Sequence, residues 1–197
     1  EHEGAVYVVA DGGPGIGREL WRILGPSLAV NQFAIINAAG DPNPQQFVSV
    51  GTRLYFVATS NTEGQELFSI QHPQTMWSLV KDIEPGVMSS TPSNLMPFGS
   101  LLLFVAFDST AGFELWRSDG TAAGTFRLID ANPGSGSSLP TEFVQVGSTM
   151  YFTATDATGL QLFKTDGTVA GTMRVKEIHV GGNPTVSNLT RFGDQVF

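Results

Sequence analysis

One strand pattern recurs along the chain at a fixed spacing of 48 residues. Each copy is a run of five mostly apolar residues, and the copies occupy residues 6–10, 54–58, 102–106 and 150–154. A further copy begins at Val196. A constant period of this length predicts a repeat protein in which each repeat forms one supersecondary unit.

Each repeat divides into four strand-like pieces separated by turn residues. The nearly continuous apolar run suits a strand that is buried on both faces. A Glu-Leu-aromatic strand follows it, and two shorter strands complete the repeat. Four antiparallel strands in 48 residues match one blade of a β-propeller. We therefore predict an all-β chain, a single β-propeller domain over residues 1–197, with repeats at 6–53, 54–101, 102–149 and 150–195 and the start of a fifth at 196–197.

Two arrangements of these blades remain open. In the first, which we favour, residues 188–192 pair with residues 6–10 and close a four-bladed ring. In the second, the chain is part of a larger propeller, and we expect the natural chain to be longer. Both use the same blades and differ only in how the array ends.

Composition excludes several classes of partner. Only 14% of the residues are charged, and 23 Gly and 11 Pro suit short strands with tight turns. A net charge of −8 repels phosphate backbones, so nucleic acid is not expected as a partner. No run approaches the roughly 18 apolar residues of a membrane span, so we predict no membrane insertion. The absence of Cys excludes disulfides and thiolate metal sites.

The segment 114–125 reads Glu-Leu-Trp-Arg-Ser-Asp-Gly-Thr-Ala-Ala-Gly-Thr, and an Asn-Pro-Gly-Ser-Gly-Ser-Ser link follows at 132–138. These residues resemble the bacterial ELWxxDGT repeat family. The likeness is strong in the third and fourth repeats, partial in the second and weak in the first. It implies a secreted or cell-surface protein of bacteria, and it implies no reaction.

The Asp-Gly-Thr turns at Asp119 and Asp166 have two interpretations. Carboxylate and hydroxyl oxygens suit calcium, so these residues are candidate metal ligands. The favoured interpretation is structural, because Asp caps turn amides, Gly accepts a positive φ and Thr ties the turn together. We expect no cofactor, with calcium as the alternative.

Candidate binding residues gather at two kinds of loop. The loop after each apolar run and the Pro/Gly/Ser link are expected on the same side of a propeller, and function generally sits in such loops. Trp77 lies outside the aromatic position shared by Trp21, Phe68, Trp116 and Phe163, which we assign to the core, so Trp77 is a candidate exposed aromatic. The candidate ligand-binding residues are Asp11, Asn61, Asp108, Asp156, Ser89, Ser90, Ser137, Ser138 and Trp77.

Catalytic signals are weak. The histidines at 2, 72 and 179 share no repeat position, and Glu19, Glu66 and Glu114 recur by repeat, as structural residues do. We therefore predict no enzyme activity and a lectin-like or adhesive module that binds a glycan or a cell-surface protein. The alternatives are a structural spacer of a bacterial surface protein and a propeller-type hydrolase or lyase.

Overall fold

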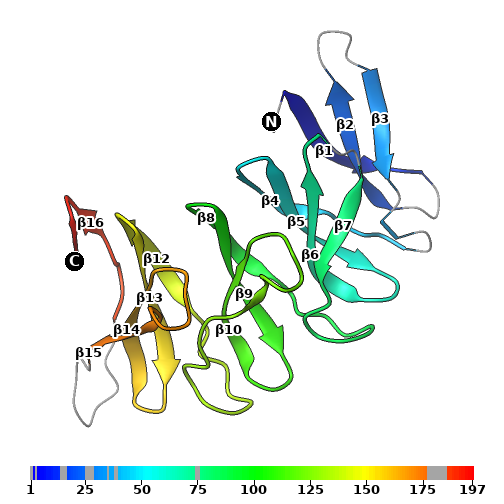
Figure 1. Cartoon of the computed structure of the whole chain (residues 1–197). Helices are drawn as coiled ribbons and strands as arrows, with labels where there is room; N and C mark the ends of the chain where they lie inside the picture. The colour runs from blue at the N-terminus through cyan, green and yellow to red at the C-terminus, as the bar shows by residue number, and fades with distance from the viewer. Residues whose placement is uncertain are drawn as a thin grey trace.

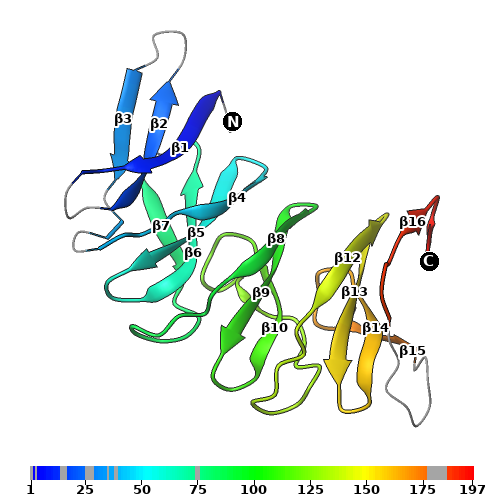
Figure 2. The ribbon, with the colours of Figure 1, turned by 180° about the vertical axis from the view of Figure 1, so that it is seen from behind.

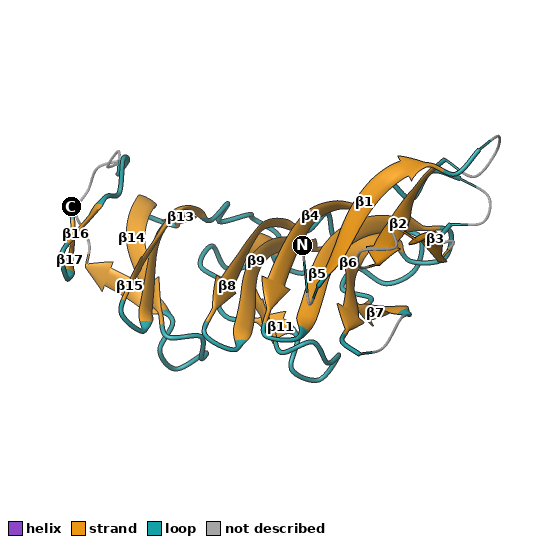
Figure 3. Cartoon of the chain, turned by 90° about the horizontal axis from the view of Figure 1, so that it is seen from above, coloured by secondary structure: helices purple, strands orange, loops and turns teal. Residues whose placement is uncertain are grey.

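The computed structural model describes residues 2, 4–13, 17–24, 29–34, 36–37, 40–73, 76–176 and 186–197. These residues form strands and loops only, as Figure 3 shows, and all strand pairs are antiparallel. The all-β prediction is confirmed. The strands are β1 (Ala5–Asp11), β2 (Arg18–Leu24), β3 (Ala29–Ala34), β4 (Gln45–Val50), β5 (Arg53–Ser60), β6 (Gly64–Gln71), β7 (Trp77–Lys81), β8 (Ser93–Phe98), β9 (Leu101–Asp108), β10 (Gly112–Ser118), β11 (Phe126–Arg127), β12 (Thr141–Val146), β13 (Thr149–Asp156), β14 (Gly159–Thr165), β15 (Met173–Lys176), β16 (Arg191–Phe192) and β17 (Gln195–Val196).

The strands form successive sheets along an open arc. The first sheet contains β1 to β3, the second β4 to β7, the third β8 to β11 and the fourth β12 to β15, and β16 and β17 form a hairpin. The three later sheets have the four antiparallel strands of a blade. Figures 1 and 2 place β4, β8 and β12 along the concave side of the arc and β3, β7 and β15 along its convex side.

The favoured ring closure is not formed. Arg191 and Phe192 pair with β17, and the predicted partner segment, residues 6–10, pairs with β2. Figure 1 shows the two ends of the chain at opposite ends of the arc. In Figure 1 each sheet is turned only part of the way relative to the last. Four such sheets leave the arc open.

The boundaries of the sheets differ from the boundaries of the repeats by one strand. β8 is the last strand of the repeat at 54–101, yet it pairs with β9, the first strand of the next repeat. β4 and β12 pair in the same way with β5 and β13. The second, third and fourth sheets therefore each join the last strand of one repeat to the first three strands of the next, whereas the first sheet contains only β1 to β3.

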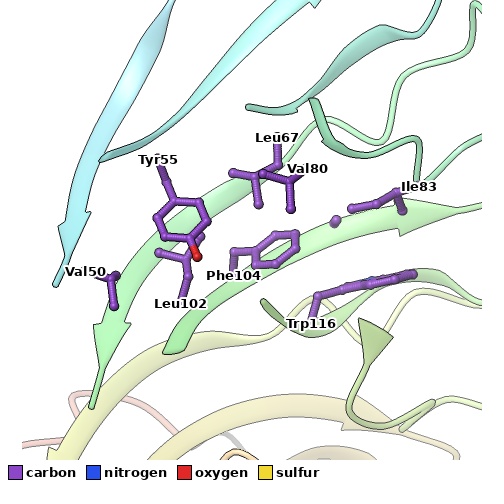
Figure 4. Packing of buried hydrophobic residues seen from close by; sticks show 9 residues of the cluster. Val50, Tyr55, Leu67, Val80, Ile83, Leu102, Phe104 and Trp116 are labelled. Atoms are coloured by element: carbon purple, nitrogen blue, oxygen red, sulfur yellow. The ribbon is translucent and has the colours of Figure 1, made fainter. Parts of the chain in front are cut away.

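The apolar core lies between the sheets. β9 sends Leu102, Phe104 and Ala106 toward the second sheet, and it sends Leu103 toward the fourth. The prediction of strands buried on both faces is confirmed for the runs at 54–58 and 102–106. It is wrong for the run at 6–10 in the first sheet, where Val6 is 43% and Val9 37% exposed. Figure 4 shows the cluster between the second and third sheets. Its members are Val50, Tyr55, Leu67, Val80, Ile83, Leu102, Phe104, Ala106 and Trp116.

The first strand of the second, third and fourth sheets, on the concave side, carries a β-bulge at a repeated position. The register of β8 against β9 shifts between Ser93 and Met96, and Asn94 has a φ of 52°. β4 and β12 show the same shift. A bulge bends a strand and increases its local twist. The left-handed residues at this position are Gln46, Asn94, Glu142 and Asn188.

Candidate functional site

The loops after the central strands and the links between sheets lie on one side of the arc, as the sequence predicted. The backbone N–H of Ser109, between β9 and β10, donates to the Glu84 carboxylate at 2.6 Å. The backbone N–H of Phe113 donates to Oγ of Ser137 at 3.0 Å. We call this side the link face. Its parts are the loops 61–63, 109–111 and 157–158 and the links 82–92 and 128–140.

Asp108 and Asp156 end β9 and β13 and form equivalent ion pairs on the link face. Oδ2 of Asp108 lies 2.6 Å from Nη1 of Arg127, and Oδ2 of Asp156 lies 3.1 Å from Nη1 of Arg174. Burial opposes ionisation of Asp108, but the hydrogen bonds from Thr110 and the nearby arginine outweigh it and lower the pKa of this carboxyl. Both carboxylates therefore already have cationic partners, and a ligand would compete with an arginine for them.

Asp11, at the end of β1, and Asn61, directly after β5, are both exposed. Asp11 accepts a hydrogen bond of 2.9 Å from the backbone N–H of Gly13. The structural equivalent of Asp108 in the second sheet is Ser60, because Ser60 pairs with Gly64 as Asp108 pairs with Gly112. Asn61 thus lies one position beyond the repeated site, fully in the loop.

Ser90 and Ser138 are buried beneath the links, where each binds a buried glutamate. The Ser90 hydroxyl donates to Oε2 of Glu66 at 2.5 Å and its backbone N–H donates to Oε1 at 3.0 Å. Ser138 donates to Glu114 in the same way, at 2.6 and 3.0 Å. Neither serine reaches solvent. They fasten the link to the sheet and are not available to a ligand from outside.

These glutamates are desolvated. Burial raises the pKa of Glu66 to about 7, against the lowering effect of the Ser90 hydrogen bonds. Burial also raises the pKa values of Glu114 and Glu19. The fourth sheet has the neutral Gln161 at this position, and it is equally buried. Recurring glutamates are therefore hydrogen-bonded structural residues, as their repetition predicted.

Ser89 and Ser137 are half-buried beside these serines. Oγ of Ser89 accepts a hydrogen bond of 2.9 Å from the backbone N–H of Gln65, which is the equivalent of the bond from Phe113 to Ser137. Both hydroxyls hold the link against the start of β6 or β10. The exposed part of each of these two serines lies on the link face.

Trp77 does not project from the link face. Its ring packs edge-on against Phe68, with 5.4 Å between the ring centroids, and it borders the cluster between the first and second sheets. The expectation of an exposed aromatic is therefore wrong, because β7 turns this side chain toward the first sheet. The shared aromatic position is buried at Phe68, Trp116 and Phe163, as predicted, but Trp21 in the first sheet is only half-buried.

The Asp-Gly-Thr turns have the same geometry in the third and fourth sheets. Oδ1 of Asp119 accepts hydrogen bonds from the Thr121 N–H at 2.9 Å and from its hydroxyl at 2.7 Å. Asp166 and Thr168 repeat both distances. These side-chain bonds lower the pKa values of both carboxyls. The turn geometry accounts for the recurring Asp and Thr without a metal.

These turns border a second surface, opposite the link face, which we call the turn face. It consists of the hairpin turns at 51–52, 99–100 and 147–148 and the two Asp-Gly-Thr turns. A groove of about 430 Å³ opens there between the third and fourth sheets. An equivalent groove of about 220 Å³ lies between the second and third sheets. These grooves have no direct signal in the sequence, because each combines turns from two repeats.

Another polar contact joins the first two sheets. Nδ1 of His2 lies 2.8 Å from Oγ of Ser49, beside a cavity of about 150 Å³ that Tyr7, Phe47 and Leu54 also line. His72 lies in the turn after β6, far along the chain from this contact, and position 179 is outside the described residues. The candidate histidines at 2 and 72 are therefore not part of one repeated site.

Within the described ranges, no three His, Cys, Asp or Glu side chains are grouped so that they could hold a metal. The described part of the chain also has no helix with the length and hydropathy needed to cross a membrane.

No protein-family model matches the chain, and no curated protein is significantly similar to it. Among solved structures, one from a structural and mechanistic study of two prolyl endopeptidases has a TM-score of 0.55 at 11% identity, covering 97% of this chain and 28% of that chain. The apo isopeptidase AtxE2 has a TM-score of 0.49 at 12% identity, covering 78% of this chain and 24% of that one. TolB from Acinetobacter baumannii has a TM-score of 0.48 at 15% identity, covering 88% and 41%.

The chain thus spans less than half the length of each of these proteins. At 11% identity the likeness to the prolyl endopeptidase is one of fold. The arc of antiparallel sheets therefore has a β-propeller-like fold.

Proposed function

We propose that the chain is a non-enzymatic binding module that recognises a glycan or a protein at a cell surface. The observation that supports this most is that consecutive sheets expose the same kinds of turn and loop to solvent. Similar polar groups therefore lie at a regular spacing along the arc. Weak sites held at fixed spacing bind a multivalent partner far more tightly than one site does.

A structural spacer is the second candidate. Asp108, Asp156, Ser90 and Ser138 all bind groups of the chain itself. A module whose repeated polar residues serve only its own fold needs no ligand. The two candidates differ in one respect, which is whether the isolated chain binds anything.

We also propose that the arc is part of a larger propeller. Val80 and Leu128 are buried where the second and third sheets meet the next sheet. Their equivalent in the fourth sheet, Val175, is 42% exposed. The β16–β17 hairpin lies beside β12, where a fifth sheet would begin. A structure of the protein with any flanking residues tests this, and a solvent-facing Val175 there would contradict it.

A bacterial surface or secreted location and membership of the ELWxxDGT repeat family are part of the same proposal. They are supported by the motif at 114–125 and by the identical turn geometry at Asp119 and Asp166. Labelling of intact bacterial cells with an antibody against the chain tests the location. Signal confined to lysed cells would contradict it.

A glycan array and isothermal titration calorimetry with simple sugars, each with and without calcium, test the binding function. We expect binding of at least one glycan, and stronger binding of multivalent than of monovalent forms. The unfolded chain is the control for adhesion through its apolar residues. If neither assay shows binding above that control, the hypothesis of glycan recognition is excluded. Recognition of a protein ligand and the structural spacer then remain.

A further inference from the structure

We propose that the groove on the turn face between the third and fourth sheets binds one neutral sugar ring. This inference rests on the proposed binding function, but it moves the site from the link face to the opposite side of the arc. The reason is that the link face uses most of its recurring polar groups internally, whereas the groove leaves several polar groups open to solvent.

The groove has the size and the lining that a single sugar requires. Its volume is about 430 Å³, which is within the roughly 300 to 1,000 Å³ of small-molecule sites. Phe98 and Leu101 are its apolar lining residues, and apolar side chains suit the C–H face of a pyranose ring. The polar residues around the rim are Ser100, Gln145, Ser148 and Asp166.

The rim offers both hydrogen-bond donors and acceptors. Oδ1 of Asp166 is occupied by Thr168, but no bond is described for its Oδ2. The amide nitrogen of Gln145 donates to the Gly147 carbonyl at 2.9 Å, which leaves its carbonyl oxygen as an acceptor. The Ser100 and Ser148 hydroxyls also have no described partner. A ring with vicinal hydroxyls can donate to the two acceptors and accept from the two serines.

The charge of the groove favours a neutral ligand. Asp166 is the one charged residue that lines it, and hydrogen bonds from Thr168 hold its pKa below the usual range. The chain as a whole carries a charge of −8. A uronic acid or a sialic acid would place a second carboxylate beside Asp166, so we infer a preference for neutral hexoses.

The smaller groove provides an internal comparison. Arg53 stands where the larger groove has Leu101, and a Cβ on Gly120 would lie 2.1 Å from its Nε. The arginine therefore fills the space beneath the Asp-Gly-Thr turn of the next sheet. In the larger groove the shorter, apolar Leu101 takes its place, and a Cβ on Gly167 would lie 3.0 Å from Cδ1 of Leu101 and 3.4 Å from Cε1 of Phe98. The fold thus tolerates either residue at this repeat position.

The test titrates the chain with methyl glycosides of glucose, galactose and mannose and with methyl glucuronide, following backbone amide shifts by NMR. We expect shifts at residues 98–101 and 145–148 with a neutral glycoside, and at least tenfold weaker binding of the glucuronide. Leu101→Arg and Asp166→Asn should each weaken binding at least tenfold, and Arg53→Leu should add shifts at residues 50–53. Ser135→Ala, on the exposed link, is the matched control and should bind normally.

The outcomes separate this proposal from the binding function. If neutral glycosides shift link-face residues and Leu101→Arg binds normally, the groove is not the site but the binding function stands. If no glycoside produces shifts and the glycan array is also blank, the groove proposal and the glycan version of the binding function both fail. Melting temperatures of the variants show whether any loss of binding comes from unfolding, and a folded Leu101→Arg variant with unchanged affinity overturns the proposal.

Discussion

The Ser90 hydroxyl lies 2.5 Å from Oε2 of Glu66, although both side chains are fully removed from solvent. The contact joins the link before the third sheet to the middle of β6. A carboxyl in such surroundings holds its proton longer than one in water, because burial disfavours the charged form.

The first prediction is that stability falls as pH rises through neutrality. The pKa of Glu66 is about 7 in the folded chain, above its ordinary value of 4.5. The folded state therefore holds a proton that the unfolded state releases. The stabilisation is complete below about pH 4.5 and is lost as pH rises through 7. Its size is on the order of 1 to 3 kcal/mol.

Urea unfolding of Glu66→Gln and of the native chain between pH 5 and 8 measures this effect. In the glutamine variant the free energy of unfolding should depend less steeply on pH, because a glutamine has no charge to bury. The native chain already has a glutamine, Gln161, at this position of the fourth sheet. Asp194→Asn, in an exposed turn, is the control. An unchanged slope in Glu66→Gln would show that another group is responsible.

The second prediction concerns Ser138. Replacing it with Ala removes the hydroxyl that donates to Glu114 at 2.6 Å. A buried carboxyl that loses a donor destabilises the fold by about 1 to 3 kcal/mol. Ser135→Ala, three residues earlier and exposed, should change the free energy of unfolding by less than about 0.5 kcal/mol. Equal effects of the two changes would contradict the structural role of Ser138.

The third prediction concerns the glycine that ends the turn motif. A Cβ on Gly124 would lie 2.1 Å from Oδ1 of Asp119. Gly124→Ala should therefore destabilise the chain by about 1 to 3 kcal/mol. In an Asp119→Ala background the same change should be smaller, because the carboxylate is gone. A double-mutant cycle by thermal unfolding measures the difference. If the destabilising effects of the two substitutions simply add, the clash with the Asp119 carboxylate is not the cause.

The fourth prediction tests the core between sheets. Phe104 is fully buried between the second and third sheets. Phe104→Ala should lower the free energy of unfolding by about 3 to 5 kcal/mol. Phe192→Ala removes a ring that is 77% exposed and should have little effect. Chemical denaturation of both variants gives the comparison, and a mild loss at Phe104 would mean that the sheets fold independently.

Much of the fold could be predicted because the period is constant. The apolar run at residues 102–106 lies within β9, and its continuous burial follows from the position of this strand between two sheets. The period does not determine which repeat supplies the neighbouring strand, so the pairing of β8 with β9 was not evident. Nor does it determine the angle between sheets, which decides whether four of them close a ring.

The bulge was also invisible in the sequence. A left-handed φ is expected of Gly or Asn, but Gln46 and Glu142 adopt it at the same repeat position as Asn94. Their backbone is held by the pairing of the strand with its neighbour. Side-chain identity therefore carries no signal there.

The candidate site was harder to predict. Ser90 and Ser138 look like loop residues in the sequence, and only their contact with a glutamate shows their role. A signal was present, since each serine follows its glutamate by 24 residues. Asn61 was misplaced by one position because Ser60 replaces the aspartate of the later repeats. The grooves could not be predicted, since they form only when two sheets meet.

The alternation of β9 between two neighbours has a consequence for evolution and for engineering. Phe104 points toward the second sheet and Leu103 toward the fourth. Deleting one residue within β9 would exchange these directions for every side chain beyond the deletion. The packing of the third sheet against both of its neighbours would then be lost together. A change of length inside a central strand is therefore more harmful than a point substitution. Insertions and deletions are expected to accumulate in the links instead.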